Sequence, residues 1–486
     1  MAARDSALGY DELPYPSAPY PYSHCDHLAQ VARLFGIQAA AVNRCRVLEI
    51  GCADGANLIP MALTLPNSEF VGIDLSPRQI AVGQDLVEQL NLKNIELRTQ
   101  NLAEFSSQTS FDYIIAHGVL SWTTPAVQTQ LLELCRNQLA PQGVCFISYN
   151  VYPGWQRRTI VREWVLRATR GIESTSEQLL AARSRIRGLR QVLERHGGEN
   201  QQECSEELAR LEGWSDGYLR HDLLEDSNEP LFFGDFVNRA ATHGLKFFAE
   251  ADVASMAGAG LPAALAAGVQ RLGKSLVERE QLLDLVTNRA FRQSLLCRAE
   301  CAARSQIDVA AVRSSYVVST LRAASTVSGT AVKFVSQSGF AITVEEPLVV
   351  AALLRLEQAW PCGGWFGELI ADADESVLEE LANILLAGFV ERAIELRTNQ
   401  LPLTNEIADY PRASLLARWQ ATAGGEVTNL RHDVVRLDAR TQQLLPLLDG
   451  TRDRATLAKR LGLNDLGSNE IDDLLRQVMR WGLLNH

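Results

Sequence analysis

The stretch Val47-Leu48-Glu49-Ile50-Gly51-Cys52-Ala53-Asp54-Gly55 decides how the first part of the chain folds. Residues 47–50 form a short apolar run typical of a buried strand, and the pattern over 57–65 favours a helix. Between them, glycines let the backbone approach a ligand closely, and the N-terminus of the following helix offers free N–H groups and the positive end of its dipole. The stretch therefore predicts a ligand-binding turn between a strand and a helix.

The same alternation of strand and helix continues outward from this turn. Further strands are expected over 70–73, 95–98, 111–116 and 143–149, and further helices over 77–90 and 126–139. Strict alternation indicates a parallel sheet with helices on both faces. We interpret 46–155 as the core of a Rossmann-like α/β domain.

Residues 156–230 interrupt this rhythm with a long helical pattern, which we interpret as an insertion. Alternation resumes with a helix over 232–243 and strands over 245–249 and 291–298, so we assign 231–304 to the remainder of a seven-stranded sheet. Residues 1–45 begin with prolines interleaved with tyrosines, a string unsuited to helix or central strand.

Beyond residue 305 the chain is mainly helical, and two of its stretches are expected to have the same order of secondary-structure elements. Residues 347–396 and 441–484 each contain helix, turn, helix, helix and a strand-like end, at 388–390 and 482–484. This predicts a diverged repeat of winged-helix-like units, in domains 305–400 and 401–486. Neither unit carries a Lys/Arg cluster on a candidate recognition helix, which favours packing or protein–protein roles over DNA binding.

Composition places the chain among soluble globular proteins. Its 486 residues carry 58 acidic and 46 basic side chains, a formal charge of −12, so the chain lacks the overall basic character expected for nucleic-acid binding. The nine cysteines are unevenly spaced and form no zinc-ligand pattern, which favours a reducing cytoplasm and no metal. The longest small-apolar run, 256–269, is shorter than the ~20 residues of a membrane span. Locally, residues 155–196 carry ten Arg against four Glu, a basic segment that could dock an acidic protein surface, although a solvated helix face is the more usual explanation of such a pattern.

The second strand ends in Asp74, and an acidic residue there can bind both hydroxyls of a ribose. The spacing of Gly51 and Gly55 fits neither a P-loop nor the GxGxxG dinucleotide fingerprint. These residues favour a nucleoside ligand, but alone they do not separate NAD from S-adenosylmethionine.

Taken in order, the motifs of residues 46–150 resemble those of class I S-adenosylmethionine-dependent methyltransferases. Other segments resemble bacterial protein-lysine methyltransferases that carry a methyltransferase regulatory domain and modify outer-membrane proteins. These segments are 10–15 (YDELPY), 149–155 (YNVYPGW), 221–236 (HDLLEDSNEPLFFGDF), 289–296 (RAFRQSLL) and 447–450 (LLDG).

The resemblance implies S-adenosyl-L-methionine as cofactor and a set of residues around it. Glu49, Gly51, Cys52 and Gly55 would form the first cofactor loop, Asp74 and Leu75 would hold the ribose and adenine, Asn101 and Leu102 would border the adenine, and His117 and Gly118 would close near the sulfonium. The N-terminal segment 1–45 would cap this site.

The segment 149–155 follows strand five, and ligands of open α/β sheets lie outside the carboxyl ends of the strands. We expect Tyr15, Tyr149, Asn150 and Tyr152 to line a channel that directs an amine toward the methyl group, and Trp155 and His221 to contact the substrate. Methyl transfer is an in-line displacement that depends on placement and on exclusion of water. A lysine acceptor must first lose a proton, which a desolvated channel favours.

Three hypotheses remain open at this point. The first is a methyltransferase that acts on lysine side chains of a protein substrate. The second is a small-molecule methyltransferase, and the third is a cofactor-binding regulatory protein without turnover. The roughly 180 residues after the sheet domain favour a large partner, while the presence of Glu49, Gly51, Gly55 and Asp74 argues against loss of turnover.

Overall fold

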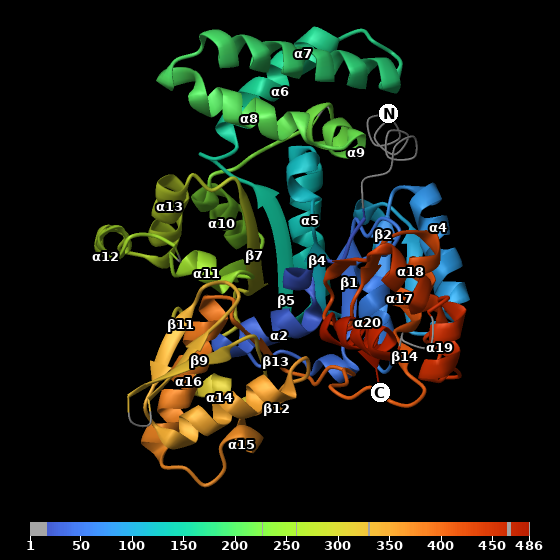
Figure 1. Ribbon diagram of the computed structural model, residues 1–486. Helices are drawn as coiled ribbons and strands as arrows, with labels where there is room; N and C mark the ends of the chain where they lie inside the picture. Colours follow the sequence, from blue (N-terminus) through green and yellow to red (C-terminus); the bar gives the residue numbers. More distant parts are fainter. Residues whose placement is uncertain (1–16, 226, 259, 329–330, 464–467, 486) are drawn as a thin grey trace.

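A seven-stranded sheet forms the centre of the molecule (Figure 1). The computed structural model describes residues 17–225, 227–258, 260–328, 331–463 and 468–485. The strand order is β3-β2-β1-β4-β5-β7-β6, with β1 to β5 parallel and β7 antiparallel to both neighbours. The strands are β1 (Arg46–Ile50), β2 (Glu69–Asp74), β3 (Ile95–Thr99), β4 (Phe111–Ala116), β5 (Leu139–Asn150), β6 (Leu245–Glu250) and β7 (Phe291–Arg298). The predicted Rossmann-like sheet is confirmed.

Helices bury both faces of the sheet, as strict alternation requires. Val47, Phe70 and Tyr113 face one core with α2 and α3, and their neighbours Leu48 and Val71 face the other with α5 and α10. The helices of this domain are α2 (Cys25–Leu34), α3 (Leu58–Thr64), α4 (Pro77–Gln89), α5 (Pro125–Gln138), α10 (Phe233–Thr242), α11 (Val253–Met256), α12 (Ala263–Leu272) and α13 (Leu276–Thr287). The order reverses between β1 and β4, and loops at such a switch point leave a crevice for a ligand.

The helical insertion follows β5 and lies beyond the carboxyl edge of the parallel strands (Figure 1). It contains α6 (Gln156–Thr169), α7 (Thr175–His196), α8 (Gln202–Glu212), α9 (Asp216–Tyr218) and a π-helical turn, η6 (Leu219–Leu223). Its helices share a small core of their own, in which Val165, Ile186 and Leu208 are fully buried. Among the described residues, no helix is long and apolar enough to cross a membrane.

The unit after β7 packs on the same core as α2 and the sheet. It contains β8 (Tyr316–Ser319), β9 (Arg322–Ser328), β10 (Ala331–Val335), β11 (Ala341–Val344), α14 (Pro347–Ala359), β12 (Gly364–Trp365), α15 (Phe366–Leu369), α16 (Glu375–Val390) and β13 (Ile394–Arg397). The β9–β10–β11 sheet was not anticipated. The strand predicted at 388–390 is wrong, because these residues end α16; the chain turns at Arg392, with φ of 56°, before β13 begins.

The C-terminal unit is a winged helix with its own hydrophobic core. It contains β14 (Arg412–Ala413), α17 (Leu415–Ala423), β15 (Glu426–Thr428), β16 (Val434–Arg436), α18 (Ala439–Leu444), α19 (Arg454–Arg460), α20 (Ser468–Arg480) and β17 (Leu484–Asn485). We call the antiparallel β15–β16 hairpin, residues 426–436, the wing. The strand-like end predicted at 482–484 is found as β17, which begins at Leu484 and pairs with β14.

One buried arginine ties the antiparallel end of the sheet together. The guanidinium of Arg292, in β7, lies 2.6 Å from Glu250 of β6 and 2.8 Å and 3.1 Å from Asp284 and Glu280 of α13. It also lies 3.9 Å from the centroid of the Phe233 ring. Together with Arg289, which lies 3.5 Å from Glu280 and 3.3 Å from Asp284, it neutralises carboxylates from two elements in a buried site.

Replacing Arg292 with Met should lower the free energy of unfolding by about 3–5 kcal/mol, because Glu250 would stay buried without its cation and Glu280 and Asp284 would keep only the more distant Arg289. Urea unfolding of the two proteins measures this. The matched control is Arg98→Met, which breaks an exposed pair with Glu96 and should cost at most about 1 kcal/mol. Equal effects of the two substitutions would contradict the assignment.

Candidate functional site

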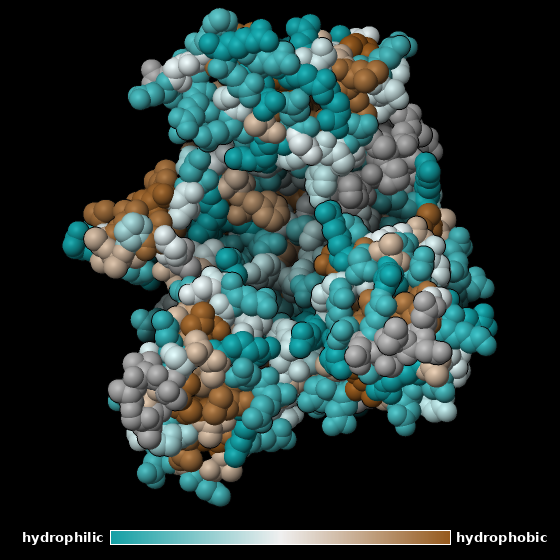
Figure 2. Space-filling model, viewed as in Figure 1, coloured by the Kyte–Doolittle hydropathy of each residue, from teal (hydrophilic) through white to brown (hydrophobic). Residues whose placement is uncertain are grey.

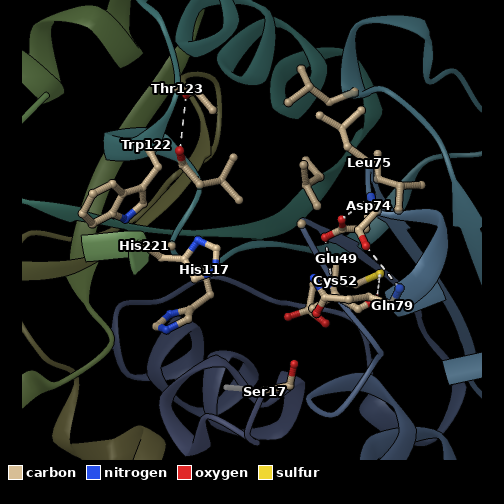
Figure 3. A pocket seen from close by; sticks show the side chains of 18 of the residues that line it. Ser17, Glu49, Cys52, Asp74, Leu75, Gln79, His117, Trp122, Thr123 and His221 are labelled. Carbon is tan, nitrogen blue, oxygen red and sulfur yellow. Dashed lines mark hydrogen bonds between the residues drawn. The ribbon is translucent and has the colours of Figure 1, made fainter. Parts of the chain in front are cut away.

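A cavity of about 790 Å³ opens at the carboxyl ends of β1, β2 and β4, at the switch point of the sheet. Figure 2 shows that the molecule is hollowed between the helical insertion and the two C-terminal units. The cavity is lined by the loops after β1 to β4, by residues 17, 18 and 20 of the N-terminal segment and by residues 220–222 of the insertion. In Figure 3, Glu49, Cys52 and Asp74 lie on one side, and His117, Trp122 and His221 on the other.

The loop after β1 has an unusual backbone that explains its glycines. Gly51 and Gly55 have φ values of 74° and 77°, a region that L side chains rarely adopt. A Cβ at Gly51 would also lie 2.7 Å from Val119. The loop therefore brings its peptide groups to the cavity wall. Cys52 lines the cavity but is 4% exposed, and its sulfur lies below the loop against Gly72.

Asp74 fixes this loop to the end of β2. Its Oδ2 accepts a hydrogen bond from the Ala53 N–H at 2.9 Å, and its Oδ1 accepts one from the Ser76 N–H at 2.8 Å. The carboxylate is also part of the cavity wall, beside Leu75, which is 40% exposed. Asp74 therefore stands where an acid that binds ribose is expected.

The side chain of Glu49 is buried, and only one of its two carboxyl oxygens has a hydrogen-bond partner among the described residues. Its Oε1 accepts a hydrogen bond from Asn57 Nδ2 at 2.8 Å, while Oε2 has no hydrogen-bond partner among the residues described. Burial, with the nearby Asp74 and Asp54 carboxylates, raises the pKa of Glu49 to about 8. A buried acid that lines a cavity with an unpaired oxygen suits a cationic group of a ligand, such as the amino group of the cofactor's methionine part.

His117 and Gly118 form the cavity wall after β4. Ser148 Oγ accepts a hydrogen bond from the Gly118 N–H at 2.8 Å and lies 3.2 Å from His117 Nδ1. The His117 ring packs 3.7 Å, centroid to centroid, from the Tyr20 ring. Burial lowers the pKa of His117 to about 4, so the ring is neutral at physiological pH. Two neutral rings accommodate a positively charged sulfonium without repulsion.

The remaining cofactor residues also lie at the cavity. Asn101 and Leu102 line it after β3, where Asn101 Oδ1 accepts a hydrogen bond from the Ala103 N–H at 3.0 Å. The structure thus brings together every residue expected at the cofactor except Gly55, which instead packs against Leu97 behind the loop. Within the described part of the chain, no group of three His, Cys, Asp or Glu side chains could hold a metal ion.

The residues expected to line an acceptor channel are more dispersed. Tyr149 is 1% exposed, stacks on Phe236 at 4.1 Å and hydrogen-bonds Ser294 Oγ at 2.9 Å, so the structure places it in the core instead of the cavity wall. The reason is strand alternation, because it is the neighbouring Ser148 that contacts the loop after β4. Tyr15 lies outside the described residues.

The other expected acceptor residues, except His221, lie outside the cavity lining. Asn150 is 3% exposed, and its Nδ2 has no partner within the described residues. Tyr152 packs on Phe232 at 5.4 Å, and Trp155 is 4% exposed under the Arg158 guanidinium. His221 lines the cavity from η6.

Sequence reasoning missed Asp222, which lines the same cavity from η6. Burial raises the pKa of Asp222 to about 7, although the nearby Arg158 opposes the shift. The segment 221–236 resembles the corresponding segment of protein-lysine methyltransferases, but this resemblance does not single out Asp222. The π-helical turn η6 is what brings Asp222 to the cavity. Tyr20 and Asn57 were also missed, because their contacts join segments far apart in sequence.

The arginines of the insertion are largely paired within it. Residues 197–225 carry eight acidic side chains and two arginines, so their six net negative charges cancel the excess counted over 155–196. The pairs are Arg157–Glu203, Arg158–Glu207, Arg183–Asp216, Arg187–Glu212 and Arg190 with Glu194 and Glu212.

A Rossmann-like sheet with a switch-point cavity, an acid after β2 and a glycine loop after β1 defines the class I methyltransferase fold. Family models agree: a methyltransferase domain matches residues 41–192, a predicted methyltransferase regulatory domain matches 215–298, and the C-terminal winged helix domain of PKMT matches 409–464. The chain belongs to the S-adenosylmethionine-dependent methyltransferases that carry a methyltransferase regulatory domain.

Individual relatives extend this match over most of the chain. An uncharacterized protein of Rickettsia prowazekii is 28% identical and covers 92% of this chain and 84% of the relative. A second one is 30% identical and covers 49% of this chain and 96% of the relative. The structure of PKMT2 from Rickettsia typhi in complex with AdoHcy covers 97% of this chain and 100% of that chain, with a TM-score of 0.83 and 23% identity. This last likeness extends the shared fold to the C-terminal units.

Replacing Glu49 with Gln should stabilise the ligand-free protein at pH 8. Between the unfolded pKa near 4.5 and the folded pKa of about 8, the unfolded state has lost a proton that the folded state keeps, so stability falls as pH rises. Gln cannot titrate, and the gain over wild type should therefore grow from near zero at pH 5 to at most about 5 kcal/mol at pH 8. Urea unfolding at several pH values tests this, and a difference that does not change with pH would contradict it.

Proposed function

We propose that this protein transfers methyl groups from S-adenosylmethionine to lysine side chains of a protein substrate. The observation that carries the proposal is the carboxyl group of Asp222, whose pKa burial raises to about 7, in the wall of the same cavity as the cofactor loop. Two comparisons support it: PKMT2 designates a protein-lysine methyltransferase, and the PKMT winged helix model matches the C-terminal unit.

The cavity has two sides that suit a donor and an acceptor. Glu49, Asp74 and the loop after β1 form the side on which we place the donor. Trp122, His221 and Asp222 line the cavity as well, and we place the acceptor amine beside them. A lysine is the natural acceptor for such a wall, since its ammonium can pair with Asp222 while its stem packs on the rings.

The chemistry requires placement of the amine and removal of one proton. When bound, the cofactor supplies an electrophilic methyl group on a positively charged sulfur. Asp222 accepts the proton from the lysine ammonium, for which a carboxyl pKa near 7 is well matched. The amine lone pair then forms the N–C bond as the C–S bond breaks and its electron pair stays on sulfur. Tyr20 and His117 exclude water from this point.

Of the residues expected at the acceptor, we place only His221 in contact with the substrate and give the others supporting roles. His221 contacts the substrate from the cavity wall, while Trp155 and Tyr152 support the segment that leads to it. Asn150 holds the start of the same segment through its backbone, which donates to Ser121 Oγ at 2.8 Å and accepts from the Leu231 N–H at 3.0 Å. The N-terminal segment closes the cavity, with Ser17, Ala18 and Tyr20 in its wall.

Incubation of the purified protein with isotopically labelled S-adenosylmethionine and bacterial protein fractions tests the proposal. Mass spectrometry should find label on lysine side chains. Label in the small-molecule fraction alone would overturn the protein acceptor. Binding of the cofactor without methyl transfer to any fraction would contradict the proposal that the protein is an active methyltransferase.

Replacing Asp222 with Asn should lower kcat by roughly 100-fold or more, because the amide cannot accept the proton. The affinity for S-adenosylhomocysteine should stay within about twofold. In the wild type kcat/KM should fall below pH 7, where Asp222 becomes protonated, and this limb should disappear in the variant. The control is Asp216→Asn, an exposed acid of the insertion paired with Arg183, and an equal loss there would contradict the role.

A further inference from the structure

The tip of the wing reaches the cofactor site from the C-terminal unit. His432, in the turn between β15 and β16, is 3% exposed, and its Nε2 lies 2.8 Å from Asn57 Oδ1. Asn57 Nδ2 in turn donates to Glu49 Oε1 at 2.8 Å. Two hydrogen bonds therefore connect a residue of the winged helix to the carboxyl group in the cavity wall.

The direction of these hydrogen bonds follows from the partners of Asn57. Its oxygen accepts the Tyr20 N–H at 2.9 Å, and its amide nitrogen donates to Glu49, so the orientation of the amide is fixed. His432 Nε2 must therefore carry the hydrogen. Burial lowers the pKa of His432 to about 3, so the ring is the neutral Nε2–H tautomer at physiological pH. The donor chain runs from His432 to Asn57 to Glu49.

The wing tip is built to hold His432 in one place. Asn429 Oδ1 accepts hydrogen bonds from the N–H groups of Arg431 and Asp433, which closes the turn. The Arg431 guanidinium lies 4.3 Å from the Trp360 ring centroid and 2.6 Å from Glu395 of β13, in the unit after β7. The tip is thus anchored on both sides of the residue that reaches Asn57.

His432 is unfavourable at this position for two reasons, its backbone conformation and its burial. Its φ of 75° lies in the left-handed region, which residues other than glycine adopt uncommonly. Its ring is buried beside His24, at 4.9 Å between centroids. An apolar residue could fill this space, but it would leave Asn57 Oδ1 without its shortest hydrogen bond. The local strain and the burial are explained if the N–H donor is what the site requires.

We propose that His432 is a positioning residue of the cofactor site. Through Asn57 it orients the Glu49 carboxyl group and the backbone of Tyr20, and the docked winged helix thereby sets the affinity for the methyl donor. This rests on the proposed function only in so far as Glu49 faces the bound cofactor. The C-terminal unit then strengthens donor binding without touching the donor.

Two substitutions at His432 separate this role from packing. His432→Phe keeps a buried ring but removes the N–H donor, while His432→Gln keeps an N–H donor at a similar distance from the backbone. Phe and Gln both adopt the left-handed region uncommonly, so the two substitutions should have a similar backbone cost. The exposed wing residue Arg436, paired with Glu426, provides the control Arg436→Ala.

Calorimetry with S-adenosylhomocysteine is the direct measurement, because binding needs no acceptor. We expect His432→Phe to raise the Kd roughly 3- to 10-fold, the effect of one lost hydrogen bond. In turnover assays, the KM for the donor should rise by the same factor, while kcat at saturating donor stays within about twofold. His432→Gln should recover most of the affinity, and Arg436→Ala should match wild type.

The outcomes distinguish this inference from the proposed function. Wild type that fails to bind S-adenosylhomocysteine would overturn the assignment of the cavity. Wild type that binds, with His432→Phe binding equally well, would overturn the positioning role alone. Equal losses in the Phe and Gln variants would also overturn it, because they would indicate packing instead of the hydrogen bond.

Discussion

The side-chain amide of Asn57 is the interaction on which the cofactor site depends. Its two atoms contact Glu49, the Tyr20 backbone, Ser23 and His432, which come from β1, the N-terminal segment and the wing. A carboxyl group buried like that of Glu49 loses its hydration, and only a fixed hydrogen-bond donor can orient it. Because the amide is fully satisfied only when all three segments are in place, completion of the site is coupled to assembly of the whole chain.

The parallel sheet explains why so few segments suffice to form the rest of the site. The carboxyl ends of β1, β2 and β4 meet at one edge, and the reversal of strand order there opens a crevice between the loops. Beside this crevice, Asp74 joins the end of β2 to the loop after β1 by accepting the Ala53 N–H, so the acid after β2 also shapes that loop. The bend at Gly51 then turns the peptide groups toward the cavity, which is why ligand binding and loop geometry use the same residues.

Local pattern predicted the sheet, the glycine turn after β1 and the acid at the end of β2, because these follow from sequence neighbours; the resemblance to class I methyltransferases supplied the other residues expected at the cofactor. A short apolar run typical of a buried strand places Asp74 and His117 at strand ends whatever the remainder of the chain does. The acceptor side did not follow in this way. Tyr149 and Asn150 are adjacent in β5 and must face opposite sides of the sheet, so they could not both line one channel. Asp222 depends on a π-helical turn, and His432 contacts a residue 375 positions away; neither leaves a local signal.

The net charge counted over one segment of the insertion differs from the charge that the folded insertion presents to a partner. Residues 155–196 carry an excess of arginine, but in three dimensions these arginines lie against the acids of α8 and the turn that follows it. Their charge holds the helices of the insertion together and leaves little net field to attract an acidic surface. At the cavity, Glu225 pairs with Arg220, and Asp222 adds a further acidic group to the wall. An acidic group in this wall suits a cationic side chain such as that of the proposed lysine acceptor.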